Sequence, residues 1–159
     1  MDKLIDDLIK LAFAEDIGDG DHTTLCCIPE TAMGKSQLII KEDGVLAGVE
    51  MAKRIFHDFD PELKMTVFIQ DGAEVKKGDI AFVVEGKIQS LLQTERLMLN
   101  VMQRMSGIAT TTRKYAKALE GTKTHVLDTR KTTPGMRMIE KEAVRIGGGM
   151  NPVSYTHLT

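Results

Sequence analysis

The chain has 159 residues, 42% of them hydrophobic, and a formal net charge of −2. This hydrophobic fraction supports a folded core and excludes a disordered chain, while the negative charge argues against bulk nucleic-acid binding. No apolar run has the length of a transmembrane helix, and Asp2, Asp6 and Asp7 stand where a targeting signal carries cations, so we expect a cytoplasmic protein with no membrane partner.

The first part of the chain mixes helical and strand patterns. Residues 2–14 place apolar side chains at helical spacing and predict an amphipathic helix. Residues 15–24, rich in carboxylates and glycines, predict a solvated loop; a calcium or magnesium site is the less favoured interpretation, because the acids do not follow the spacing of a calcium-binding loop. Residues 35–46, with their Asp43-Gly44 turn, predict a hairpin, residues 49–59 a helix and residues 64–70 a strand.

A pattern of turn, short strand and turn over residues 71–86 is also found in small barrel modules that carry biotin or lipoate. Such a module presents one lysine alone at the tip of a tight hairpin, whereas Lys76 and Lys77 lie inside the connection between Val75 and Ile80. A non-catalytic carrier or interaction module is therefore kept as an alternative.

Residues 90–105 carry the strongest helical pattern, with a broad apolar side and a narrow polar stripe that contains Arg96. A stripe this narrow suggests that other segments cover the helix and that Arg96 faces a groove or a partner. The alternative, which spacing alone favours, is a surface contact of Arg96 with Glu95 or Asn100. Ser106-Gly107 predicts a break, followed by a second helix to residue 119 and a strand over residues 122–127.

A group of cations and hydroxyls follows this strand, in the sequence Asp128-Thr129-Arg130-Lys131-Thr132-Thr133-Pro134-Gly135. A guanidinium grips a carboxylate or phosphate through two parallel hydrogen bonds, and the adjacent ammonium adds a compact charge. The sequence therefore predicts a small anion-binding loop. A helix is expected over residues 136–146, and the glycines at 147–149 then predict a helix stop with close backbone packing, since a dinucleotide fingerprint stands between a strand and a helix.

Several motifs occur in one order at compatible distances: residues 17–24 (IGDGDHTT), 95–100 (ERLMLN), 105–110 (MSGIAT), 128–135 (DTRKTTPG) and 147–151 (GGGMN). Together they resemble the quinolinate phosphoribosyltransferase family, also called nicotinate-nucleotide pyrophosphorylase (carboxylating). The resemblance runs from the first helix to Asn151.

The resemblance implies an α/β fold in two parts. Residues 1–107 are expected to form an α+β N-terminal domain with a mixed sheet and helices, and residues 108–151 the first strand and helix of an incomplete parallel α/β barrel. Residues 152–159 form a tail that does not match the family. We therefore expect a truncated chain that is marginally stable and inactive alone.

The resemblance also implies the chemistry. The family joins quinolinate to phosphoribosyl pyrophosphate, with Mg²⁺ present, and yields nicotinate mononucleotide, pyrophosphate and carbon dioxide for NAD synthesis. Arg130 and Lys131 match catalytic cations that, with Thr129, bind the quinolinate carboxylates. Arg96 matches a substrate-binding arginine that enters the site from the neighbouring subunit of a homodimer. The magnesium ligands are expected beyond this chain, and a molybdenum-transport companion protein of the same fold is the alternative.

Overall fold

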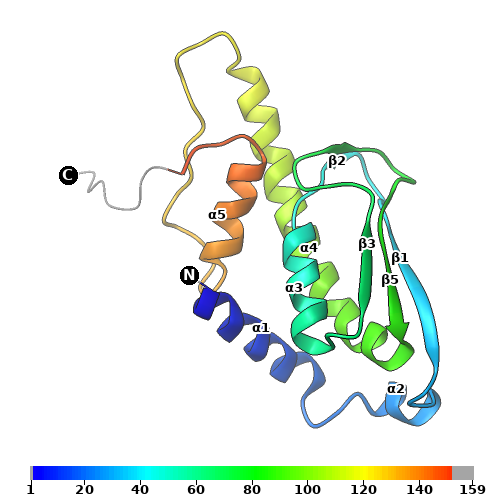
Figure 1. Cartoon of the computed structure of the whole chain (residues 1–159). Helices are drawn as coiled ribbons and strands as arrows, with labels where there is room; N and C mark the ends of the chain where they lie inside the picture. Colours follow the sequence, from blue (N-terminus) through cyan, green and yellow to red (C-terminus); the bar gives the residue numbers. More distant parts are fainter. Residues whose placement is uncertain (1, 152–159) are drawn as a thin grey trace.

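The computed structural model describes residues 2–151 and consists of small antiparallel sheets with helices packed beside them (Figure 1). The expected tail over residues 152–159 lies outside the described residues. The helices are α1 (Asp2–Ile17), α2 (His22–Cys27), α3 (Val49–Phe59), α4 (Ile88–Ala118) and α5 (Arg137–Ile146). The strands are β1 (Met33–Ile39), β2 (Gly44–Val45), β3 (Lys64–Val67), β4 (Glu74–Val75) and β5 (Ile80–Lys87).

The strands form two sheets, with the order β1-β5-β3 in one and β2-β4 in the other, and every pair is antiparallel. The expectation of a mixed sheet in this part is therefore wrong. The expected hairpin over residues 35–46 is also wrong, because β1 pairs with β5 while β2 pairs with β4. Strand β5 is central because its apolar run, residues 81–84, is buried on both faces.

Helix α4 is continuous for 31 residues, so the predicted break at Ser106-Gly107 is wrong. The Ser106 hydroxyl accepts a hydrogen bond from Ala47 N at 3.0 Å and donates to Ala47 O at 3.1 Å, which ties the helix to the segment before α3. A glycine inside a helix costs roughly 1 kcal/mol, and burial of the flanking Met105 and Ala109 offsets it. The expected domain boundary at residues 107 and 108 thus lies inside an unbroken helix.

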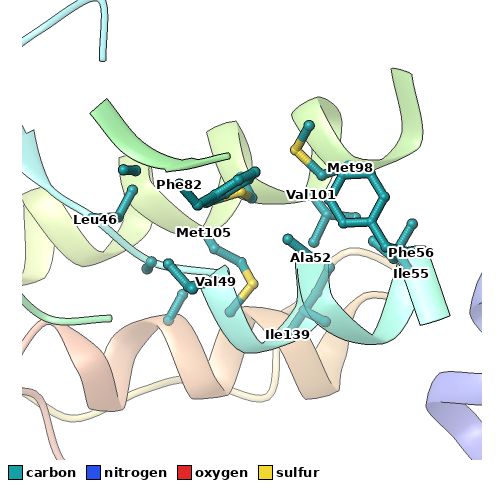
Figure 2. Packing of buried hydrophobic residues seen from close by; sticks show 14 of the residues in the cluster. Leu46, Val49, Ala52, Ile55, Phe56, Phe82, Met98, Val101, Met105 and Ile139 are labelled. Carbon is teal, nitrogen blue, oxygen red and sulfur yellow. The ribbon is translucent and has the colours of Figure 1, made fainter. Parts of the chain in front are cut away.

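Apolar side chains from α3, β5, α4 and α5 meet in one core (Figure 2). Phe56 of α3 and Phe82 of β5 contact edge to face, with ring centroids 6.3 Å apart. Ile139 of α5 is 2% exposed and belongs to the same cluster. Helix α5 is therefore fixed to the body of the molecule by its apolar face.

The turn predicted at Asp71-Gly72 supplies the missing cap of α3. Gly48 precedes this helix with φ 104° and has no side chain to offer to the free amides of the first turn. The Asp71 carboxylate accepts from Val49 N at 2.8 Å and from Glu50 N at 3.3 Å instead. A side chain at residue 48 would lie 3.2 Å from the backbone of Met102, so glycine also allows α3 to approach α4 closely.

The strand expected over residues 122–127 is reduced to one parallel bridge between Leu127 and Met150. Met150 N donates to Val126 O at 2.8 Å, and Asp128 N donates to Met150 O at 3.1 Å. A strand needs neighbours along its length, and the structure describes only one residue after Met150. A parallel pair connected through α5 is the unit from which α/β barrels are built, although residues 2–151 contain no closed barrel.

Among the described helices, none combines the length and the apolar composition that crossing a membrane requires.

Candidate anion-binding site

The loop predicted to bind an anion, residues 128–135, runs from the Leu127–Met150 bridge towards the start of α5. Its first six residues, 128–133, are called the anion-binding loop below. Thr129, Arg130, Lys131 and Thr133 are exposed. The side chain of Asp128, by contrast, is only 3% exposed. The loop therefore has a buried base and an exposed cationic surface.

The first end of the loop is held by the buried carboxylate of Asp128. The ammonium of Lys141, from α5, lies 2.5 Å from Asp128 Oδ2. The amide of Asn151, oriented with its nitrogen towards the carboxylate, donates to the same oxygen at 2.6 Å. A buried carboxylate needs such partners, because an unpaired one costs several kcal/mol.

The second end of the loop is held by Glu140, also from α5. Glu140 Oε2 accepts from Thr133 N at 3.3 Å, and Oε1 accepts from Arg104 Nε at 2.9 Å. Arg104, from α4, also donates to Thr133 Oγ1 at 2.5 Å. Burial acts to raise the pKa of Glu140, but the hydrogen bonds from Arg104 and Thr133 outweigh it, and the pKa lies below its usual range. Glu140 is therefore an anion at neutral pH.

The middle of the loop is held by its own hydroxyls and by Arg137. Thr129 Oγ1 accepts from Lys131 N at 3.1 Å, while Arg137 donates to Thr132 Oγ1 at 3.2 Å and to Arg130 O at 3.3 Å. Each of these hydroxyls still has its own hydrogen to donate. Within residues 2–151, no hydrogen bond or ion pair engages the side chains of Arg130 and Lys131. The backbone of the loop thus makes hydrogen bonds, whereas the side chains of the two predicted cations make none with residues 2–151.

Arg96, the third predicted substrate-binding cation, does not contact the loop. Its guanidinium contacts Asp16 of α1 at 2.5 Å, and its side chain is 70% exposed. That hydrogen bond and the charge of Asp16 raise the pKa of Arg96. Arg104, the α4 arginine that does reach the loop, lies eight residues further on, which is about 12 Å along a helix. Arg96 therefore does not contact Arg130 or Lys131 within one chain. The expected surface contact of Arg96 with Glu95 or Asn100 is wrong as well, because Asp16 is its hydrogen-bond partner.

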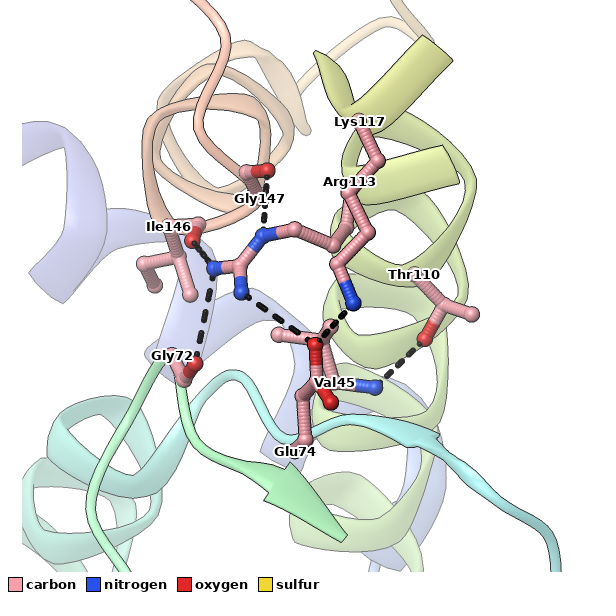
Figure 3. Close-up of polar contacts among 8 residues, drawn as sticks. All are labelled: Val45, Gly72, Glu74, Thr110, Arg113, Lys117, Ile146 and Gly147. Atoms are coloured by element: carbon pink, nitrogen blue, oxygen red, sulfur yellow. Dashed lines mark hydrogen bonds and ion pairs between the residues drawn. The ribbon is translucent and has the colours of Figure 1, made fainter. Parts of the chain in front are cut away.

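Arg113 of α4 fixes the far end of α5 (Figure 3). Its guanidinium donates to the carbonyl oxygens of Gly147 at 3.0 Å, Ile146 at 3.1 Å and Gly72 at 3.4 Å. A side chain at residue 147 would lie 2.6 Å from the carbonyl oxygen of Ala109. The prediction of a helix stop with close backbone packing at the three glycines is thus confirmed.

The acidic stretch at residues 15–24 is partly helical rather than an open loop. Helix α1 continues to Ile17, and Asp21 caps α2 by accepting from Thr24 N at 3.1 Å. Anywhere in residues 2–151, no three His, Cys, Asp or Glu side chains are grouped closely enough to hold a metal ion.

Sequence reasoning located Arg130, Lys131 and Thr129 but missed the residues that hold their loop: Arg104, Glu140 and Lys141. Arg104 stood at the edge of the polar stripe of its helix, and Glu140 and Lys141 had the spacing of ordinary surface residues. Their partners lie 36 residues away for Arg104 and 13 residues away for Lys141. A local pattern cannot reveal contacts at these separations.

Two family models match the chain. The quinolinate phosphoribosyl transferase N-terminal domain matches residues 21–106, and the C-terminal domain of the same family matches residues 108–157. The second match extends beyond Asn151, into the residues that the sequence analysis set apart as a tail.

Similar proteins point to the same family. A quinolinate phosphoribosyltransferase (decarboxylating) from Nicotiana glauca is 47% identical over 91% of this chain and 41% of its own length. A probable nicotinate-nucleotide pyrophosphorylase (carboxylating) from Synechocystis is 42% identical over 93% of this chain and 50% of its own length. The crystal structure of NadC from Streptococcus pyogenes has a TM-score of 0.91 at 40% identity, over 96% of this chain and 54% of that protein. The chain thus spans about half, or less, of the proteins that it matches.

Proposed function

Since the chain belongs to the quinolinate phosphoribosyltransferase family, we propose that it forms the quinolinate-binding part of an enzyme of NAD synthesis. The complete enzyme transfers the phosphoribosyl group of phosphoribosyl pyrophosphate to quinolinate. Nicotinate mononucleotide, pyrophosphate and carbon dioxide are the products. The names of the relatives favour this activity over the molybdenum-transport and carrier alternatives.

The observation that carries the proposal is the pair of unengaged cations on a held loop. Arg104, Arg137 and Lys141 each bond to neighbouring groups of the loop or of α5, whereas Arg130 and Lys131 have no such contact within residues 2–151. Quinolinate carries two adjacent carboxylates, which match a guanidinium and an ammonium from adjacent residues.

The same two cations suit the charge changes of the reaction. Loss of carbon dioxide leaves negative charge on the pyridine ring, and pyrophosphate leaves from a sugar carbon that gains cationic character. Cations already in place stabilise the developing negative charge without reorganisation. Arg130 and Lys131 therefore act by electrostatics, with Thr129 as an additional hydroxyl donor.

Magnesium is proposed to enter with phosphoribosyl pyrophosphate. Its protein ligands are proposed to lie outside residues 2–151, among which no three His, Cys, Asp or Glu side chains are grouped for a metal ion. The proposed roles of Arg130, Lys131 and Thr129 do not depend on the metal.

We further propose a homodimer in which Arg96 of one copy serves the loop of the other. Leu92 and Leu99 flank Arg96 on α4 and are 42% and 39% exposed. They also line an apolar hollow between β1 and α4. Apolar side chains around a cation on one helix face suit a protein interface. The cytoplasm is the proposed location, although several plant relatives are named as mitochondrial or chloroplastic.

Calorimetric titration of the 159-residue chain with quinolinate tests the binding role. Each charge-assisted hydrogen bond contributes about 1.5–3 kcal/mol, so Arg130→Met and Lys131→Met should each weaken binding by roughly 10-fold or more. Nicotinate, with one carboxylate, should bind more weakly than quinolinate. Arg145→Met is the control, because Arg145 is exposed and bonds to Glu142 within its own helix. Equal affinities for the two acids, or full affinity in both loop variants, would contradict the proposal.

A further inference from the structure

Two consecutive residues of α5 hold opposite ends of the anion-binding loop, and we propose that Glu140 and Lys141 are positioning residues that preorganise Arg130 and Lys131. Lys141 bonds to Asp128 at the first end, and Glu140 bonds to Thr133 at the last. The inference rests on the proposed function, since it assigns to these residues the geometry of the quinolinate-binding cations.

Helical geometry makes this arrangement possible. Consecutive side chains of an α-helix point about 100° apart, so neighbours in α5 reach partners that are five positions apart in the loop. Arg137, one turn earlier, adds a contact in the middle through Thr132 and the carbonyl of Arg130. One helix therefore sets the path of the whole loop.

Helix α5 is itself rigidly placed. Ile139 and Ala143 are buried in the core, with exposures of 2% and 0%. Arg113 holds the carbonyl groups at its C-terminal end. A loop attached to α5 at three points takes its position from the core rather than from its own flexible backbone.

The charges support positioning rather than packing alone. Five cations gather near the loop: Arg104, Arg130, Lys131, Arg137 and Lys141. The carboxylates of Asp128 and Glu140 face Lys141 and Arg104. The two anions thus compensate Lys141 and Arg104, which leaves three positive charges. Arg137 is engaged with the Thr132 hydroxyl and the Arg130 carbonyl, so the side chains of Arg130 and Lys131 remain for a ligand. Preorganisation matters because each side chain that a ligand must immobilise lowers the affinity.

Hydrogen exchange and quinolinate titration of Lys141→Met in the 159-residue chain test the proposal. We expect amide exchange over residues 128–133 to rise about 10-fold, and quinolinate affinity to fall about 10-fold, while exchange in the buried part of α4 stays unchanged. Lys141→Arg keeps the cation and should recover most of both. Arg145→Met, one turn further along α5, is the matched control and should change neither.

Unchanged exchange over residues 128–133 in Lys141→Met overturns the proposal, as does a rise that extends equally through α4. If Lys141→Met does not fold, Glu140→Gln provides the same comparison at the other end of the loop, because it removes the charge and keeps the shape. If the unmodified chain binds no quinolinate, the proposed function fails, and the exchange data alone then decide whether α5 holds the loop.

Discussion

At the scale of single residues, Arg113 makes a contact outside the loop that ties α4 to the end of α5. Three carbonyl oxygens, from Gly147, Ile146 and Gly72, share its guanidinium. Arg113→Met leaves these acceptors without their charged donor, so we expect the free energy of unfolding to fall by about 1.5–3 kcal/mol in urea titrations. Lys114→Met, at an exposed neighbouring position, should stay within about 0.5 kcal/mol of the unmodified chain.

Glu140 gives the loop a defined acid sensitivity. Its folded pKa lies below the ordinary value of 4.5, so its ionised form contributes stability above that pH and loses it as the pH falls through the folded pKa. Glu140→Gln should therefore cost about 1 kcal/mol at neutral pH. This difference from the unmodified chain should shrink below pH 4.5 in unfolding curves measured at several pH values. A difference that stays constant down to acid unfolding would contradict this assignment.

At the scale of elements, the packing of α5 against α4 depends on a missing side chain. A Cβ atom at residue 147 would lie 2.6 Å from the Ala109 carbonyl oxygen and 2.7 Å from Thr112 Cβ. Gly147→Ala should force the helices apart and lower stability by about 1–3 kcal/mol. Gly107→Ala, on the exposed side of α4 with open space around it, should stabilise the chain by up to about 1 kcal/mol, and thermal unfolding of both variants compares the two sites.

Elements with a complete local signal were predictable from the sequence. Helix α3 was expected at residues 49–59 and occurs at Val49–Phe59, because its apolar period is regular. The prediction of a hairpin over residues 35–46 is wrong because β1 pairs with β5, more than 40 positions away, and not with the segment after the local turn. The prediction of a break in α4 is wrong because hydrogen bonds of Ser106 with Ala47 and of Thr110 with Val45 stabilise the helix around Gly107.

The candidate site likewise contains residues that a local sequence pattern predicts and residues that only distant contacts bring into place. Arg130 and Lys131 could be proposed because a strand-like pattern, two cations and a turn are adjacent in the sequence. Arg104 could not be assigned, because its role depends on how α4 crosses α5. The residues proposed to contact a ligand thus have a local sequence signal, whereas the residues that hold the loop do not.

At the scale of the whole molecule, two pairs of exposed apolar side chains belong to different parts of the fold. One surrounds the parallel bridge, where Leu127 is 60% and Met150 51% exposed. The other contains Leu92 and Leu99, around Arg96 on α4. The first continues the parallel pair with which α/β barrels begin, and the second is the surface proposed for a second copy.

Mixing two defective variants tests the shared site. If Arg96 of one copy completes the loop of the other, a dimer of one Arg96→Met chain and one Arg130→Met chain has one intact site and one with both changes. Random exchange of subunits in a two-fold dimer should then restore native affinity at about a quarter of all sites, visible as a tight-binding fraction in calorimetry. A mixture of Arg130→Met and Lys131→Met is the control, because both changes fall on the same loop and no pairing of these chains rebuilds it. Native-affinity sites in neither mixture would show that Arg96 does not act across copies.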